Sequence, residues 1–106
     1  MYQVKIIENA WLAKLAAQKL KACNAAIVIG STIYLYGVSK TSFLNNPSWV
    51  RHELKHVEQY RKLSTPVFIV QYLYQCIRFG YYRAPLEVAA RRAEMDECII
   101  KNYRII

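Results

Sequence analysis

The two histidines of the chain, His52 and His56, stand four residues apart in a segment whose start marks it as a helix. Asn46 can cap the first turn through its side-chain oxygen, and Pro47 suits the first helical position because it has no N–H to leave unpaired. The helix is therefore expected from Pro47 to about Leu63. Residues four apart share one face of a helix, so both imidazoles project together and can chelate one metal ion.

The other elements follow from hydrophobic spacing and from breakers. Apolar residues recur at helical spacing from about Asn9 to Ala22, with Asn9 as the candidate cap. Gly30-Ser31 joins two β-branched and aromatic runs, the pattern of a hairpin with a type II′ turn. This order predicts an α+β fold in one domain, residues 1–106: an N-terminal helix, a β-hairpin and then three helices. The remaining expected elements are strands 25–29 and 32–36, a short helical turn from Ser39 or Thr41 to Leu44, and helices 66–79 and 85–101.

The charge of the chain is basic but evenly spread. Lys and Arg number 15 against 7 Asp and Glu, which gives a net charge of +8. The basic residues form no dense run, and no RNA- or DNA-binding signature is recognisable, so a solvated basic surface is expected and no nucleic-acid partner. A basic nucleic-acid binder would be marked by a steep salt dependence of binding.

Three features favour the cytoplasm as the location. The chain has an odd number of cysteines, and none of them has CxxC spacing: Cys23, Cys76 and Cys98. They are therefore expected to be buried free thiols in a reducing compartment. Residues 1–10 lack the positive region followed by an apolar core that marks a secretory signal. The longest apolar stretch, 66–77, is interrupted by two glutamines and is well short of the ~20 residues that span a bilayer.

Glu53 indicates a catalytic role for the histidine pair. It lies next to His52 at the edge of the shared face, where it can reach a water without binding the metal itself. A His-Glu-x-x-His pattern on a helix is typical of zinc metallopeptidases, in which the glutamate is the general base. The alternative is an ordinary pair of surface histidines.

A third ligand is needed, because catalytic zinc is commonly held by three protein side chains. The chain has no third histidine, so a carboxylate must complete the set. Glu87, in the first turn of the last expected helix and 31 residues after His56, is the candidate. Glu94, two turns further on, is the alternative ligand or a hydrogen-bond partner of a ligating histidine. A first-turn glutamate can also be there simply because the helix dipole favours it.

These residues carry a family resemblance. His52-Glu53-x-x-His56 followed by Glu87 on a later helix resembles the gluzincin metallopeptidases. The segments 46–59 and 85–90 are similar to short bacterial HExxH proteins of unassigned function. The size and the order of elements resemble the minigluzincins, minimal scaffolds related to catalytic domains of integral-membrane peptidases.

The resemblance implies a Zn²⁺ ion held by His52, His56 and Glu87, with Glu53 as the general base. Gln59 matches a glutamine of the same pattern that carries no assigned role.

The chain departs from the pattern close to the third ligand. Many relatives carry an acidic residue two positions after that ligand or an Asp four positions after it, where this chain has Ala89 and Arg91. A ligating histidine would then lack its usual carboxylate partner unless Glu94 supplies one. This departure weakens the prediction of catalysis more than it weakens the prediction of zinc binding.

The predicted reaction is hydrolysis of peptide bonds by a zinc-activated water, whose proton Glu53 takes and passes to the leaving amine. A peptide or protein substrate is expected to lie along the hairpin edge, at 32–36, by strand addition. The oxyanion needs a donor, and the sequence leaves four tyrosines as candidates: Tyr60, Tyr81, Tyr82 and Tyr103.

The competing hypothesis is a non-catalytic zinc-binding interaction module of a larger assembly. A chain of 106 residues leaves little room for a deep cleft, and bound zinc could serve only to stabilise the fold. Glu53 discriminates between the two, because a structural site needs no general base and closes its fourth position with protein.

Aromatic residues crowd the segment 66–82. The ordinary interpretation is a core and helix-packing surface. The alternative is an apolar patch that binds a protein partner, a hydrophobic substrate or an anionic membrane, since Lys62, Arg78 and Arg83 lie nearby. The aromatic residues concerned are Tyr72, Tyr74, Phe79, Tyr81 and Tyr82.

Overall fold

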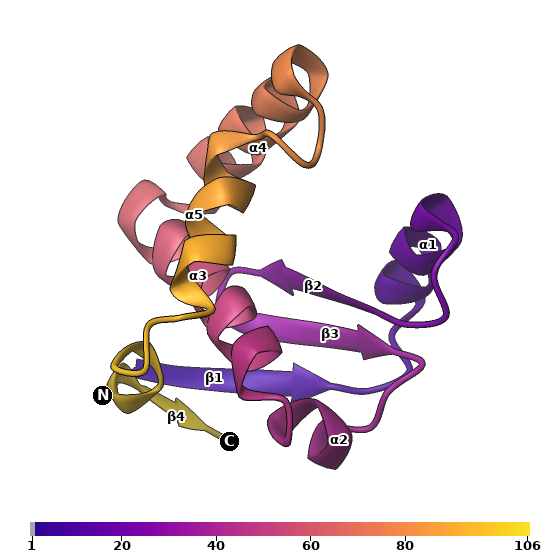
Figure 1. Ribbon diagram of the computed structural model, residues 1–106, viewed down its shortest axis with the longest axis vertical. Helices are drawn as coiled ribbons and strands as arrows, with labels where there is room; N and C mark the ends of the chain where they lie inside the picture. Colours follow the sequence, from indigo (N-terminus) through magenta and orange to yellow (C-terminus); the bar gives the residue numbers. More distant parts are fainter. Residues whose placement is uncertain (1) are drawn as a thin grey trace.

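The computed structural model describes residues 2–106, and Met1, part of the expected domain 1–106, lies outside the described residues. Over that range, helices and a four-stranded sheet form the mixed α+β fold that the sequence predicts (Figure 1). The elements in chain order are β1 (Tyr2–Ile7), α1 (Trp11–Leu20), β2 (Ala25–Ile29), β3 (Thr32–Tyr36), α2 (Lys40–Leu44), α3 (Pro47–Leu63), α4 (Thr65–Phe79), α5 (Pro85–Ala93), the 3-10 helix η1 (Ile99–Asn102) and β4 (Tyr103–Ile105).

The strand order of the sheet is β2-β3-β1-β4. Strands β2 and β3 form the predicted antiparallel hairpin, with Val28 opposite Ile33 and with Gly30 at φ 63° in the turn. Strand β1 pairs in parallel with β3 on one side and with β4 on the other. The free edge of the hairpin is therefore β2. The expectation that 32–36 offers an edge to a substrate is wrong, because β1 occupies that side of β3.

The chain starts with a strand rather than with the expected helix. Val4 and Ile6 are buried and alternate with the exposed Gln3 and Lys5, the period of a strand with one face in the core. Helix α1 then begins at Trp11 with Ala10 as its cap, so the predicted cap at Asn9 is wrong. Asn9 has φ 53° and belongs to the turn between the two elements.

The predicted C-terminal helix 85–101 is too long. Helix α5 ends at Ala93, and the backbone N–H of Cys98 then bonds to the side chain of Asp96 in the following turn. The remaining residues form η1 and β4, which returns to pair with β1. Because the helix ends at Ala93, the residues after it can return to the sheet and add β4 beside β1.

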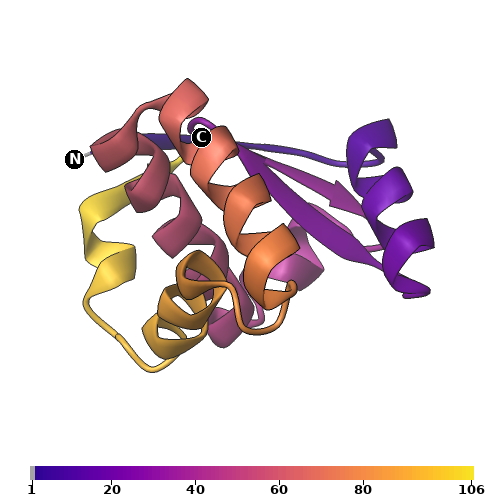
Figure 2. The same cartoon turned by 90° about the horizontal axis from the view of Figure 1, so that it is seen from above.

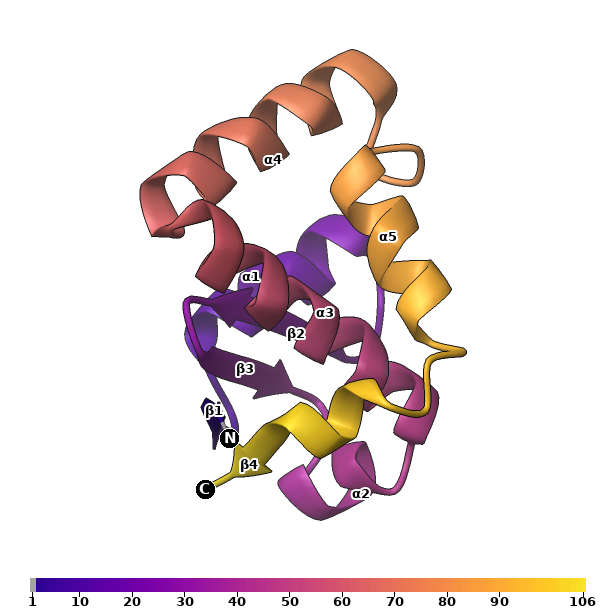
Figure 3. The same ribbon diagram turned by 90° about the vertical axis from the view of Figure 1, so that its left-hand side faces the viewer.

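The sheet separates α1 from the other long helices. Helix α1 packs on β2 and β3, whereas α3 lies on the opposite side of the sheet with α4 and α5 beyond it (Figure 2 and Figure 3). The largest fully buried side chains belong to one hydrophobic cluster between these layers: Val4, Ile33, Leu35, Phe43 and Leu54. One side of α3 thus faces the core, and its other side meets α4 and α5.

The three cysteines are free, but the prediction that they are buried is wrong. Cys23 and Cys98 are exposed and Cys76 is half-buried. Cys23 and Cys98 lie in connections between elements, which run over the surface of a domain. Among the described residues, no helix has both the length and the apolar character that crossing a membrane requires.

Replacing Gly37 should destabilise the fold more than replacing Gly30. Gly37 has φ +78°, and a Cβ atom there would lie 2.3 Å from the carbonyl oxygen of Cys23. Gly30 also has a positive φ, but its nearest neighbour would be Oγ1 of Thr65 at 3.9 Å. Both alanine variants carry left-handed strain of ~1–2 kcal/mol. Gly37→Ala should lower the free energy of unfolding by a further ~1–3 kcal/mol in denaturant titrations, because it also overpacks. Equal losses would contradict the close approach at Gly37.

Candidate metal centre

Helix α3 begins as the sequence predicts. The side-chain oxygen of Asn46 accepts a hydrogen bond from the backbone N–H of Trp49 at 3.4 Å, and Pro47 occupies the first helical position. Val50, Leu54 and Val57 on one side of the helix join the hydrophobic cluster. This fixes the rotation of α3 and turns its histidine face toward α4 and α5.

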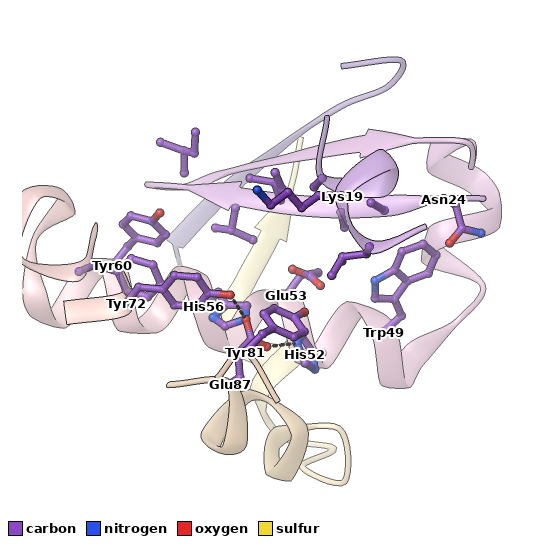
Figure 4. Close-up of a pocket in the computed structure, with 18 of the residues that line it drawn as sticks. Lys19, Asn24, Trp49, His52, Glu53, His56, Tyr60, Tyr72, Tyr81 and Glu87 are labelled. Atoms are coloured by element: carbon purple, nitrogen blue, oxygen red, sulfur yellow. Dashed lines mark hydrogen bonds and ion pairs between the residues drawn. The ribbon is translucent and has the colours of Figure 1, made fainter. Parts of the chain in front are cut away.

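His52, His56 and Glu87 come together at this face. Nε2 of His52 lies 3.2 Å from one carboxylate oxygen of Glu87, and Nε2 of His56 lies 3.2 Å from the other. Ligand atoms of the three side chains lie within 4.8 Å of one another. Figure 4 shows both imidazoles turned toward the Glu87 carboxylate, which α5 brings to them from its first turn. His52, His56 and Glu87 thus form a group that could hold a metal ion, and we call these three residues the metal group.

The remaining ring nitrogen of each histidine is hydrogen-bonded. Nδ1 of His52 lies 2.8 Å from a carboxylate oxygen of Glu94, which is one of the two roles that the sequence left open for Glu94. Nδ1 of His56 lies 2.9 Å from Oε1 of Gln59. Both partners are acceptors, so each Nδ1 carries a hydrogen and each Nε2 is the atom that can bind a metal once it loses its proton. The arrangement fits a metal ligand set, and it gives Gln59 the role that the sequence left open.

Glu87 is positioned by contacts from two other helices. The Tyr72 hydroxyl on α4 donates a 2.5 Å hydrogen bond to the Glu87 carboxylate. The neighbouring Leu86 donates its backbone N–H to Oε1 of Gln75 at 2.9 Å and accepts from Nε2 of Gln59 at 3.0 Å.

Sequence reasoning missed Tyr72 and Gln75 as site residues. The available signal was their spacing of three residues, which puts both on one face of α4. The two glutamines that interrupt its apolar run were also visible, but one of them, Gln71, is exposed and takes no part in the site.

Glu53 lies beside the metal group without belonging to it. Its side chain is buried next to the two histidines (Figure 4). Burial raises the pKa of Glu53 to about 7, although the nearby His56 and His52 work in the opposite direction. A carboxyl group with that pKa can take up and release a proton near neutral pH.

The pKa values of the two histidines are raised by their carboxylate neighbours, so these side chains hold protons where a metal ion would bind. Burial disfavours the charged form of His52, but its carboxylate neighbours, Glu87 foremost, outweigh burial and raise the pKa of His52 to about 9. The same balance raises the pKa of His56. At Glu87 burial favours the neutral acid, yet hydrogen bonds from the two imidazoles hold the pKa well below its usual range.

A cavity of ≈ 780 Å³ opens beside the metal group. The whole of strand β2 lines it, as do Trp49 and Phe68, so the β2 edge of the sheet and the three residues of the metal group share one space. Its volume lies within the ~300–1,000 Å³ range of ligand-binding clefts. The domain therefore contains a cleft of ligand-binding size, although a chain of 106 residues was expected to leave little room for one.

The cavity divides the tyrosine candidates for stabilising an oxyanion. Tyr60 and Tyr81 line it, and so does Tyr72. Tyr82 is 71% exposed, and Tyr103 is buried in β4, where its hydroxyl accepts a hydrogen bond from Arg61. Tyr82 and Tyr103 are absent from the cavity wall. Among the tyrosines that line the cavity, Tyr72 already donates its hydroxyl to Glu87, and Tyr60 is buried on α3. Tyr81 is therefore the remaining candidate for stabilising an oxyanion.

Comparison of the chain with protein-family models, with curated proteins and with solved structures finds no match.

Removing the hydrogen bonds of Gln59 should weaken metal binding. Gln59→Leu leaves Nδ1 of His56 without its partner and frees the carbonyl of Leu86 beside Glu87. Zinc affinity, measured by competition with a chromophoric chelator, should fall roughly 10–100-fold. The matched control is Gln71→Leu, an exposed position on α4, and it should leave affinity unchanged. Equal affinities for the two variants would show that Gln59 does not position the ligands.

Metal binding should release protons and strengthen as pH rises. His52 has a pKa of about 9 in the metal-free protein, so it is protonated at pH 7 and must lose that proton to bind. Apparent affinity should therefore rise with pH and level off near pH 9. Calorimetric zinc titrations at pH 7 in buffers of different ionisation enthalpy count the protons.

The matched variant for the proton release is Glu94→Gln. It removes one of the carboxylates that raise the pKa of His52, so fewer protons should be released at pH 8. A binding enthalpy that is the same in every buffer would contradict a protonated ligand set.

Proposed function

We propose that this protein is a zinc-dependent metallopeptidase. The observation that carries the proposal is the convergence of two imidazole Nε2 atoms on the Glu87 carboxylate, with the buried Glu53 beside them and an open cavity in front. Two histidines and one carboxylate suit zinc and leave a coordination position for water or substrate. Bound zinc would supply Lewis-acid chemistry, making water acidic and polarising a carbonyl group.

Glu53 is the general base in this proposal. It is not needed as a ligand, because the metal group is complete with His52, His56 and Glu87. Burial raises the pKa of Glu53 above its ordinary value, and in this proposal its carboxylate accepts the proton of the attacking water as the new C–O bond forms. It then donates that proton to the amine nitrogen as the C–N bond breaks.

The substrate is a peptide in extended conformation, bound along β2. An edge strand offers unpaired backbone N–H and C=O groups, with which a substrate backbone can form ladder hydrogen bonds. Strand β2 is this edge and also a wall of the cavity. Trp49, Phe68 and Ile69 make much of the facing wall apolar, which favours apolar substrate side chains.

A non-catalytic zinc-binding interaction module is the second candidate function, and one observation favours it. The metal group joins side chains of α3 to one of α5, while α4 contacts the group through the Tyr72 hydroxyl on Glu87 and through the Phe68 ring, which lies edge-on to His56. A zinc ion there would fasten the C-terminal helices to the rest of a small domain. The two candidate functions differ in the role of Glu53, which is a general base in the metallopeptidase and has no catalytic role in the interaction module.

Replacing Glu53 should separate zinc binding from hydrolysis. Glu53→Gln keeps the size of the side chain and removes its ability to accept a proton, so zinc content should stay at about one equivalent. Turnover of a fluorescence-quenched peptide library should fall by ~10²–10⁴-fold. The matched control is Glu58→Gln on the same helix, whose carboxylate is paired with Lys55 and Lys62 outside the metal group.

Three outcomes would overturn this assignment. Turnover unchanged in Glu53→Gln would remove the general base. Wild-type protein that holds zinc, gains thermal stability from it and cleaves no peptide of the library would support the interaction module instead. Failure of the purified chain to take up zinc under zinc-replete conditions would end both candidate functions.

A further inference from the structure

The outer face of helix α4 is apolar and exposed. Val70 and Ile77, seven residues apart and so on one face, are 68% and 87% exposed. Leu73, Tyr74 and Val67 lie on the same side of the helix and are also exposed. Helix α4 projects from the rest of the molecule, with its C-terminal end far from the sheet (Figure 1). We call this surface the outer face of α4: Val67, Val70, Leu73, Tyr74 and Ile77.

The helix cannot roll over to bury this face. Its opposite side carries the buried Phe68, and Tyr72 and Gln75 are hydrogen-bonded to Glu87 and Leu86. Rotation of α4 would break both bonds and leave the Glu87 carboxylate short of a donor. A helix that is apolar on all sides is normally surrounded by a protein core or by lipid. Here the protein covers only one side.

The segment of the chain that contains the outer face carries a net positive charge. From residue 59 to residue 86 the chain contains four basic residues and no acidic one. Arg78 and Arg83 flank the projecting end of the helix, and neither forms an ion pair among the described residues. The exposed Tyr82 lies between them in sequence. Apolar residues, tyrosines and arginines together are the composition of surfaces that sit in the headgroup region of a membrane.

We propose that the outer face of α4 docks on an anionic lipid bilayer. The helix has 15 residues, which is too short to span the membrane but long enough to lie in its interface. The arginines would meet lipid phosphates while the apolar side chains enter the acyl boundary. A second copy of the chain fits less well, because pairing these faces would bring Arg78 and Arg83 of two chains together, each with a net charge of +8.

Vesicle sedimentation tests the proposal with the full chain and without reference to hydrolysis. The wild type should bind vesicles that mix phosphatidylglycerol with phosphatidylcholine, and should bind pure phosphatidylcholine at least tenfold more weakly. Ile77→Glu and Val70→Glu should each lower the partition coefficient about tenfold or more. Met95→Glu is the matched control, since Met95 is 85% exposed in the turn after α5 and the charge change is the same. Circular dichroism checks that each variant is folded.

A second pair of changes tests the electrostatic part. Arg78→Gln with Arg83→Gln should weaken binding to the anionic vesicles, and so should 0.5 M salt, because salt screens exposed charges.

Three results would overturn the proposal. They are absence of wild-type binding to anionic vesicles, an equal loss in Met95→Glu, and a dimer in sedimentation equilibrium that Ile77→Glu dissociates while no vesicle is bound. The last result would assign the face to a second copy. None of them bears on zinc uptake or on the role of Glu53.

Discussion

The carboxylate of Glu87 is the buried charge on which the arrangement of α3, α4 and α5 depends. An ionised carboxylate inside a protein is strongly unfavourable unless it is paired and hydrogen-bonded. Here the two histidines come from α3, the tyrosine hydroxyl from α4 and the carboxylate itself from α5. The three helices are therefore held at the distances that satisfy one side chain. The same partners leave the Nε2 atoms of the histidines facing a common point, which is the geometry that a metal ion requires.

The part of the site carried by α3 could be predicted because it depends on local spacing. The Asn-Pro start, the four-residue separation of the histidines and the position of Glu53 follow from the helix alone. The sequence left Glu94 as an alternative ligand or as a hydrogen-bond partner of a ligating histidine, and Glu94 does contact His52 although α5 ends at Ala93, just before it. Side-chain reach tolerates such an error in a boundary.

The rest of the site depends on contacts between distant residues. Tyr72 and Gln75 act only because the chain reverses after α4 and brings Leu86 and Glu87 beside them. No local pattern fixes that turn. Strand β4 is similar, because its three residues pair with β1 at the other end of the chain. Strand β1 differs, since the alternation of Val4 and Ile6 with polar neighbours was a sufficient local signal and could have been recognised.

Missing β1 had a consequence for function. A hairpin considered alone has two free edges, and nothing in the local pattern favours the expected strand 32–36 over the strand 25–29. Insertion of β1 beside β3 removes one edge and leaves β2, the strand that lines the cavity. The strand available for backbone pairing and the wall of the cleft are thus the same element, because the N-terminal residues complete the sheet.

The size of the domain links the metal group to the exposed side of α4. A chain of 106 residues has one hydrophobic cluster, and α4 contributes only Phe68 to its buried residues. The other inward positions of this helix are taken by Tyr72 and Gln75, whose polar groups hold Glu87 and its neighbour. A mostly apolar helix that uses its inner side for polar contacts must display apolar residues on its outer side. The positioning of Glu87 and the apolar outer face of α4 are therefore two results of one orientation of the helix.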